Sequence, residues 1–153
     1  MAPLSKDEVL ASFRMEFDEA KYHEIRDLWK HHSINEDNRN VEGILTTLSA
    51  DCRYEIVNTA LVWVGKAGAA QFYKELLTAI PDAKFTLQHI AIGPQGVFEE
   101  AILTGHHKGD FRSFPATQQK IESIVGIFFP WNGKAKLFSG ERIYAEVAKI
   151  FAS

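Results

Sequence analysis

The chain has 153 residues, 46% of them apolar and 24% charged, with a formal net charge of −3, so we expect a single globular domain over residues 1–153. This slightly acidic balance, without a run of five or more like charges, argues against nucleic acid as a partner. A lone cysteine, Cys52, excludes a disulfide framework and a cysteine-based zinc site, and the lack of a leader-like or membrane-length apolar segment favours a cytoplasmic protein without a membrane partner.

The first predicted element is a long helical lead over residues 5–33. Ser5 and Glu8 have the spacing of a capping box, and apolar residues follow at helical intervals. A polar segment over 35–40 is expected to form a loop. Residues 41–48 repeat apolar side chains at intervals of three and four, which predicts a second, short helix.

Two strands and a third helix come next. Residues 52–57 and 61–64 are rich in β-branched and aromatic side chains, and Asn58-Thr59 between them has the turn chemistry of a hairpin. A helical apolar pattern over 68–80 ends at Pro81, a residue that disfavours helix at the position before it.

From residue 84 onward the pattern is that of strands. Turns are expected at 93–96 and 132–133, where glycine occurs between apolar runs, and a loop at 109–119. The predicted strands are 85–92, 97–105, 121–129 and 137–146. Helices first and a long antiparallel sheet last indicate an α+β fold with the helices on one face of the sheet.

Two histidines on these strands are candidates for acid or base chemistry. The period of two places His89 on the face of Phe85 and Leu87, and His107 on the more apolar face of the following strand. Each has two interpretations: His89 is either a hydrogen-bonded residue at the edge of the core or a general acid or base, and His107 lies either in solvent at a strand end or at the mouth of a cavity. Neighbouring histidines such as His106 and His107 cannot both face one point on a regular strand, and we expect no metal site.

The closing strand carries charge on both faces. Glu141 shares a face with apolar neighbours, and Glu146 shares the opposite face with Arg142 and Tyr144. A carboxylate on the inner wall of a cavity has a raised pKa and can move protons at neutral pH. The alternative for Glu141 is an ion pair with Arg142 of a neighbouring protomer or with a nearby lysine.

Large side chains on the strands and on the third helix are candidates to line a pocket, although most such residues belong to a core. The residues assigned to ligand binding are Tyr54, Trp63, Phe72, Glu100 and Phe128.

Several stretches, taken in order, resemble the SnoaL-like (polyketide cyclase-like) branch of the nuclear-transport-factor-2-like superfamily from about residue 37 to the C-terminus. The closing pattern Glu-Arg-x-Tyr-x-Asp of that family is similar to residues 141–146, where Glu146 stands in place of the aspartate. The other similar stretches are Asp51-Cys52-Arg53-Tyr54, Gly65 to Tyr73 followed by Pro81-Asp82, Glu100 to His107, and Pro115-Ala116-Thr117-Gln118.

The resemblance implies a strongly curved, cone-like antiparallel sheet that encloses a hydrophobic pocket together with three helices. It implies a homodimer formed through the outer face of the sheet, no cofactor, and a small hydrophobic or polyketide-like ligand. The family's cyclases close a ring by a cofactor-free intramolecular aldol reaction with an aspartate as acid and base, and here that role would fall to Glu141 or Glu146.

Two functions therefore stay open. One is a cofactor-free cyclase, isomerase or dehydratase, in which His107 or Glu141 removes a proton next to a carbonyl and His89 or Tyr144 stabilises the enolate oxygen. The other is a non-catalytic module of the same fold that binds a hydrophobic ligand or forms a dimer. Convergence of His89, His107 and Glu141 on a common point would favour the first function, whereas scattered or ion-paired groups would favour the second.

Overall fold

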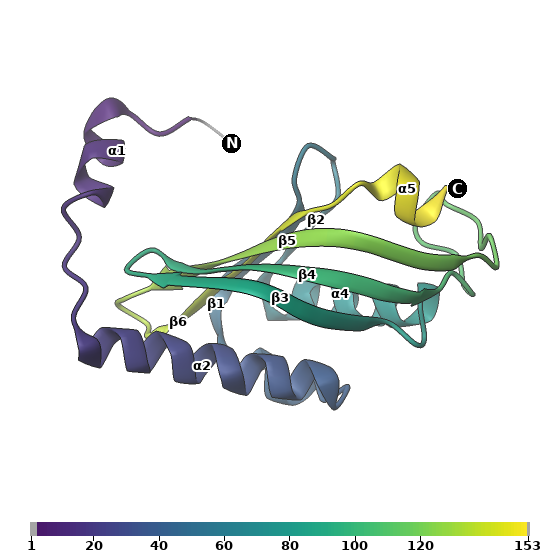
Figure 1. The fold of residues 1–153 in the computed structure, drawn as a ribbon, viewed down its shortest axis with the longest axis horizontal. Helices are drawn as coiled ribbons and strands as arrows, with labels where there is room; N and C mark the ends of the chain where they lie inside the picture. The colour runs from purple at the N-terminus through teal and green to yellow at the C-terminus, as the bar shows by residue number, and fades with distance from the viewer. Residues whose placement is uncertain (1–2, 153) are drawn as a thin grey trace.

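The computed structural model describes residues 3–152, with five helices and six strands among them (Figure 1). The elements are, in chain order, α1 (Lys6–Ser12), α2 (Glu19–Asp37), α3 (Val41–Leu45), β1 (Leu48–Ile56), β2 (Val62–Val64), α4 (Gly65–Ala79), β3 (Lys84–Gly93), β4 (Gly96–His106), β5 (Lys120–Asn132), β6 (Leu137–Tyr144) and α5 (Val147–Phe151). Within residues 3–152 no helix has the length and apolar content needed to cross a membrane.

The helical lead is two helices and not one, which corrects the predicted continuous helix over residues 5–33. The capping box at the start of α1 is present, with Ser5 and Glu8 bonded to each other's backbone N–H. A second cap interrupts the helix, because the side chain of Asp18 accepts a hydrogen bond from the N–H of Lys21 and starts α2 there. Since α1 buries none of its residues, it stands apart from the sheet (Figure 1).

Helix α2 continues four residues beyond the end expected at Ser33. The buried side chain of Asn35 explains this, because its Nδ2 donates to the carbonyl of His31 and its Oδ1 accepts from Asn40. These hydrogen bonds satisfy the polar side chain of Asn35, so the helix can continue through a segment that the sequence pattern assigned to a loop. Chain reversal is confined to Asn38–Asn40, and the helix therefore carries Glu36 toward the interior of the molecule.

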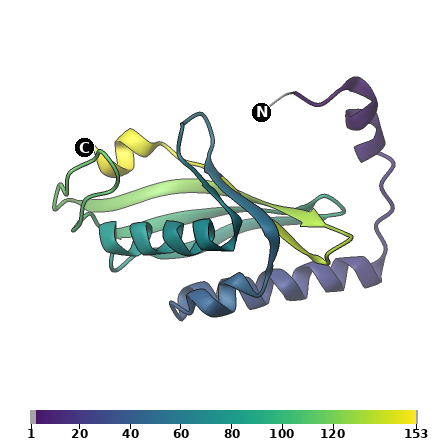
Figure 2. The same ribbon diagram turned by 180° about the vertical axis from the view of Figure 1, so that it is seen from behind.

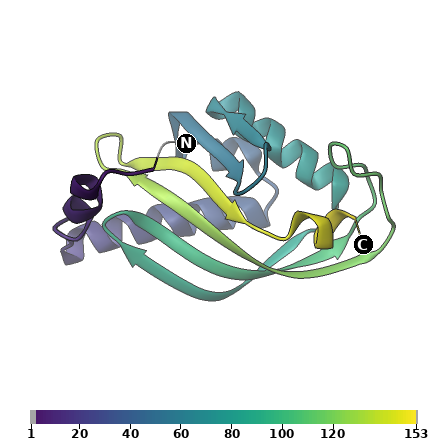
Figure 3. The same cartoon turned by 90° about the horizontal axis from the view of Figure 1, so that it is seen from above.

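The six strands form one curved sheet in the order β2-β1-β6-β5-β4-β3, and the predicted turns between β1 and β2, β3 and β4, and β5 and β6 are confirmed (Figure 3). All neighbours pair antiparallel except β1 and β6, which run parallel. A wholly antiparallel sheet was therefore a wrong prediction at this one contact. Strands so far apart in the sequence need no tight turn between them, so they can pair in either direction.

The mixed α+β architecture with a curved sheet and helices on its inner side is confirmed (Figure 2). Alternate residues of β5 show the two faces plainly, since Ile121, Ser123, Val125, Ile127 and Phe129 are buried. Their neighbours point to the outer face, where Ile124 is exposed. Helices α2 and α4 cover the inner face, and the short α5 closes the end of the sheet where the chain finishes.

Candidate active site

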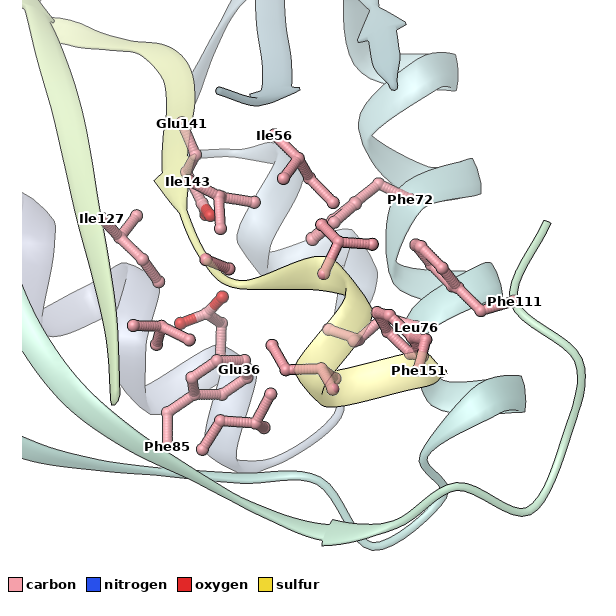
Figure 4. A pocket seen from close by; sticks show the side chains of 15 residues that line it. Glu36, Ile56, Phe72, Leu76, Phe85, Phe111, Ile127, Glu141, Ile143 and Phe151 are labelled. Carbon is pink, nitrogen blue, oxygen red and sulfur yellow. The ribbon is translucent and has the colours of Figure 1, made fainter. Parts of the chain in front are cut away.

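A pocket lies between the inner face of the sheet, α4 and α5 (Figure 4). Its volume is about 40 Å³, room for a few water molecules at most. Two carboxylates, Glu36 and Glu141, are the charged groups in an otherwise apolar wall. The remaining lining residues are Ile56, Phe72, Leu76, Phe85, Leu103, Phe111, Val125, Ile127, Ile143, Ala145, Val147, Ile150 and Phe151.

Four polar side chains meet at the Glu141 end of this pocket. The Oε1 atom of Glu141 accepts a hydrogen bond from Nε2 of His32 at 3.0 Å and one from the hydroxyl of Tyr73 at 2.9 Å. The Tyr73 hydroxyl also lies 2.6 Å from Oε1 of Glu36, which is 3.6 Å from the same imidazole nitrogen. Elements from both ends of the chain, α2, α4 and β6, thus build one compact cluster.

Two consecutive hydrogen bonds, from His32 to Thr47 and from Thr47 to the backbone, fix the protonation state of the His32 ring. Its Nδ1 lies 2.6 Å from Oγ1 of Thr47, whose own proton is donated to the carbonyl of Ile44. The hydroxyl can therefore only accept from the ring, so Nδ1 carries a proton. The other nitrogen, Nε2, faces the carboxylate of Glu141 and also donates. With two N–H donors, the buried His32 is an imidazolium cation.

The pKa values of the cluster agree with this assignment. Burial alone would lower the pKa of His32, but the negative charges and hydrogen bonds of Glu36 and Glu141 outweigh it and raise that pKa to about 10. Burial raises the pKa of Glu141, and the hydrogen bond from His32 opposes that rise. The carboxylate of Glu141 is therefore a stronger base than an exposed glutamate.

A second tyrosine, Tyr54, extends the cluster beyond Tyr73, and both act as hydrogen-bond donors. The hydroxyl of Tyr54 lies 3.1 Å from that of Tyr73, whose proton points to a carboxylate, so Tyr54 donates to Tyr73. Burial, and next the charge of Glu141, raise the pKa of both phenols well above the ordinary value. Both tyrosines therefore stay protonated at neutral pH and can donate hydrogen bonds.

A second cavity, of about 50 Å³, lies under α2 on the other side of Glu36. Glu99 of β4 lines it and is itself buried. Burial, together with the charges of Glu36 and Glu141, raises the pKa of Glu99 to about 8, so this side chain is mostly neutral at pH 7. The interior thus places a largely neutral carboxyl group beside the cluster of His32, Glu36 and Glu141.

The same cluster is where the described residues could hold a metal ion. His32, Glu36 and Glu141 each offer one ligand atom, and these atoms lie within 4.8 Å of one another. A metal would need Nε2 of His32 to lose its proton, whereas the hydrogen-bond geometry uses that proton to bind Glu141. The expected absence of a metal site stays a prediction.

Among the residues expected from the sequence, Glu141 and Phe72 line the pocket. Tyr54 lies directly behind the cluster through its bond to Tyr73. Trp63 is buried against Phe72, with ring centroids 5.0 Å apart, and supports the pocket wall from outside. These four side chains lie in one region of the molecule.

His107 is fully buried but lies outside the pocket lining, near its α5 end. Its ring meets the ring of Phe151 edge to face, with centroids 5.3 Å apart, and Phe151 lines the pocket. The alternative of a solvated histidine at a strand end is wrong, because the side chain has no exposed surface. The alternative of a position at a cavity mouth stays a prediction, because Phe151 lies between His107 and the pocket.

The remaining expected site residues lie on the outer face or edge of the sheet, away from the pocket. The inward orientation expected for His89 is wrong, because an irregularity between Leu87 and His89 shifts the register by one residue and pairs His89 with Glu100, on the outer face. The others placed outside are Glu100, Phe128, Tyr144 and Glu146, of which Tyr144 and Glu146 are exposed.

Three members of the cluster, His32, Glu36 and Tyr73, were not among the expected site residues. The sequence holds one signal for them, a His-x-x-x-Glu spacing that places His32 and Glu36 on one helical face if the helix continues past residue 33. Tyr73 lies in the predicted helix over 68–80 and ends the family-like stretch from Gly65, but neither pattern assigns it a role in the site. The contact between His32 and Glu141 joins residues 109 positions apart, which no local pattern predicts.

Comparison with known protein families gives one match. Residues 16–136 match the model of the SnoaL-like polyketide cyclase family. The matched segment contains His32, Glu36 and Tyr73, whereas α1 precedes it and β6 follows it. A search of curated proteins finds no relative of this chain.

Solved structures share the fold at low sequence identity. A candidate SnoaL-like polyketide cyclase from Jannaschia sp. CCS1 is 14% identical, with a TM-score of 0.77 over 91% of this chain and 99% of that one. A candidate polyketide cyclase from Silicibacter sp. TM1040 is 20% identical, with a TM-score of 0.67 over 83% and 92%. A protein from Catenulispora acidiphila with a ketosteroid isomerase-like fold, in complex with trimethylamine, is 14% identical, with a TM-score of 0.65 over 82% and 89%.

Proposed function

The chain belongs to the SnoaL-like polyketide cyclase family, and we propose that it is a small cofactor-free enzyme that performs acid–base chemistry on a hydrophobic carbonyl compound. One observation carries this proposal. A buried carboxylate, Glu141, is held by a cationic imidazole and a tyrosine hydroxyl at the wall of an otherwise apolar pocket. Buried ionised groups are costly unless they are paired or used, and this arrangement has the residues that proton transfer needs.

In the proposed mechanism Glu141 is the base. Its carboxylate removes a proton from the carbon next to the substrate carbonyl, and the C–H electron pair moves into an enolate whose negative charge rests on the carbonyl oxygen. His32 and Tyr73 already bind the Oε1 atom of Glu141, so the second oxygen, Oε2, is assigned to accept the proton. The proton on Glu141 then returns to the rearranged product, which leaves the enzyme unchanged.

Donors for the enolate oxygen lie in the same cluster. The hydroxyl of Tyr73 and the N–H of His32 both bind the carboxylate of Glu141. Glu141 becomes a weaker acceptor once it has taken the substrate proton, and either donor can then turn to the negative charge that develops beside it. The apolar remainder of the wall excludes water, which strengthens each of these interactions. Ring closure by an aldol step, double-bond migration and dehydration all begin with such an enolate, and this first step is what the proposal covers.

The test measures proton removal without knowledge of the natural substrate. The protein is incubated in D₂O with 2-tetralone, a hydrophobic ketone, and exchange at the carbons next to the carbonyl is followed by NMR. We expect Glu141→Gln to slow the enzyme-dependent exchange by about a hundredfold or more, the usual contribution of a general base. Tyr73→Phe should slow it by about tenfold or more through loss of a donor.

A matched control is available on the neighbouring strand. Glu55 of β1 is also a buried glutamate, but its partners are Arg53 and Arg142 and it does not line the pocket. Glu55→Gln should leave the exchange rate within about twofold of the parent. Exchange by Glu141→Gln at the parental rate would refute Glu141 as the base.

A second function, a non-catalytic module that binds a hydrophobic ligand, is favoured by a different observation. His89, His107 and Glu141 do not converge on one point, and Glu141 is hydrogen-bonded to His32 and Tyr73. Saturable binding of the ketone without protein-dependent exchange in the parent would support this module over the enzyme.

A further inference from the structure

The end of the pocket remote from Glu141 is filled by an aromatic ring from the C-terminal helix. Phe151 of α5 is buried and stacks on Phe111, with ring centroids 4.2 Å apart and an angle of 8° between the rings (Figure 4). A third ring, the imidazole of His107, meets Phe151 edge to face at 5.3 Å. The Phe151 ring therefore occupies a slot that is shaped for a planar ring.

His107 supplies an unused hydrogen-bond donor in this slot. Its Nδ1 accepts from the backbone N–H of Thr117 at 3.4 Å. The Thr117 hydroxyl, 3.2 Å from the same nitrogen, already accepts from the N–H of Gln119 and can turn its own proton to Nδ1, which places the ring proton on Nε2. Within residues 3–152, Nε2 is buried and has no hydrogen-bond partner. Such orphaned donors are rare in folded proteins, because each has lost its bond to water without a replacement.

Helix α5 is a short element that lies beside β5 at the end of the sheet. It has five residues, it follows the end of β6 at Tyr144, and two of its backbone hydrogen bonds close locally, from Ile150 to Glu146 and from Ala152 to Ala148. Its buried side chains, Ile150 and Phe151, are apolar and pack into the pocket. Short elements are among the first to open in native proteins.

The pocket has to open if it is to receive a carbonyl compound. A volume of about 40 Å³ is far below the several hundred Å³ of typical ligand sites. Removal of Phe151 would add the space of one ring in line with the existing pocket, because Phe151 lines its wall. The same movement would uncover the imidazole of His107, which Phe151 now contacts.

We propose that Phe151 is a displaceable plug in a ring-binding subsite, and that the ligand carries a planar ring with an oxygen acceptor. The ligand ring takes the place of the Phe151 ring on Phe111, and its oxygen accepts the free N–H of His107. This inference rests on the proposed function, since it describes the far end of the same pocket. It assigns to His107 a role in substrate binding rather than in proton removal from carbon.

The experiment measures binding of 2-naphthol, a planar ring with an oxygen, and of naphthalene, which lacks the oxygen, by fluorescence titration. We expect Phe151→Ala to bind 2-naphthol about tenfold or more tightly than the parent, because the plug no longer competes with the ligand. Phe13→Ala is the matched control, since Phe13, just after the end of α1, is 82% exposed, and it should bind as the parent does. Phe151→Leu, a milder change, replaces Phe151→Ala if circular dichroism shows that the latter is unfolded.

The role of His107 is tested in the Phe151→Ala background. His107→Leu should weaken 2-naphthol binding by about fivefold or more, the effect of one hydrogen bond, and leave naphthalene unchanged. His107→Gln keeps an N–H donor and should restore part of the preference for 2-naphthol. The proposal would be overturned if the parent and both Phe151 variants bound 2-naphthol equally well. It would also be overturned if the preference for 2-naphthol over naphthalene survived His107→Leu.

Binding is measured here without any chemical step, so the result is separate from the exchange assay. Tight binding that depends on His107, without exchange that depends on Glu141, would support the ring-binding subsite and refute the proposed enzymatic function. Exchange that depends on Glu141, together with no effect of Phe151→Ala on binding, would support the proposed enzymatic function and refute the role of Phe151 as a displaceable plug.

Discussion

At the scale of single residues, the interior holds three carboxyl groups around one imidazole. His32 is the shared ion-pair partner of Glu36 and Glu141, and Glu99 lies on the far side of Glu36. Three ionised carboxylates around a single cation would leave excess negative charge in a dry interior, which is unfavourable. Retention of a proton on Glu99 relieves that excess, in agreement with its raised pKa.

This proton predicts how stability depends on pH. The pKa of Glu99 is about 8 in the folded protein against 4.5 for the ordinary side chain, so the folded state holds the proton more strongly. The stabilisation is fully present below pH 4.5 and is lost as the pH rises to 8, by on the order of a few kcal/mol. The raised pKa of His32 acts in the same direction between pH 6.5 and about 10. The free energy of unfolding should therefore be larger at pH 5.5 than at pH 8.5, as measured by urea denaturation.

Glu99→Gln isolates the contribution of this one group. The variant should lose a large part of the fall in stability between pH 5.5 and 8.5, because glutamine does not ionise, and the part that comes from His32 should remain. Glu100→Gln, on the opposite face of the same strand, should keep the parental pH dependence. An unchanged dependence in Glu99→Gln would show that Glu99 is ionised in the folded protein.

At the scale of elements, the position of Glu141 depends on the parallel contact between β6 and β1. Gly140 pairs with Arg53, and Glu141 with Tyr54, so the site carboxylate and the site tyrosine occupy facing positions. Gly140 has a φ of +114°, and a Cβ added there would lie 2.1 Å from the carbonyl oxygen of Arg53. Only glycine fits this close approach of two strands.

Gly140→Ala should therefore destabilise the protein by about 2 kcal/mol or more, since it combines an unfavourable φ with a backbone clash. The displacement of β6 should also reduce Glu141-dependent exchange of 2-tetralone. Thermal unfolding measures the first effect and NMR the second. Gly93→Ala is the matched control, because a Cβ at Gly93 meets no atom within 4 Å, and its stability should stay within about 0.5 kcal/mol of the parent.

The elements also show how far the sequence can predict this molecule. Periodicity predicted the strands and the α4 helix, because each follows from local burial. It placed Glu141 and Glu146 on opposite faces of the last strand without deciding which of them faces the pocket, and the structure places Glu141 there. It could not predict the orientation of His89, which depends on an irregular pairing with β4. It ended α2 too early, since the bonds of Asn35 to His31 and Asn40 form only in the folded helix. The site itself needed contacts across the whole chain.

At the scale of the whole molecule, the curved sheet has one face in the core and one face open. The open face carries an apolar group from three neighbouring strands, in which Phe98 and Tyr144 contact each other and Ile124 lies on the strand between them. A contiguous exposed apolar surface of this kind is typical of an interaction site. The resemblance noted in the sequence predicts that a second copy of the chain covers it, which gives a homodimer.

Ile124→Lys tests this prediction, because it places a charge at the centre of the open face without a change in the core. We expect the parent to have the mass of a dimer in size-exclusion chromatography with light scattering, and Ile124→Lys to have that of a monomer at the same concentration, since an unpaired charge at the centre of an interface is strongly unfavourable. Val64→Lys is the control, because Val64 and Ile124 are both 64% exposed but Val64 lies on the edge strand β2. A monomeric parent, or a dimer that survives Ile124→Lys, would mean that the open face does not hold two copies together.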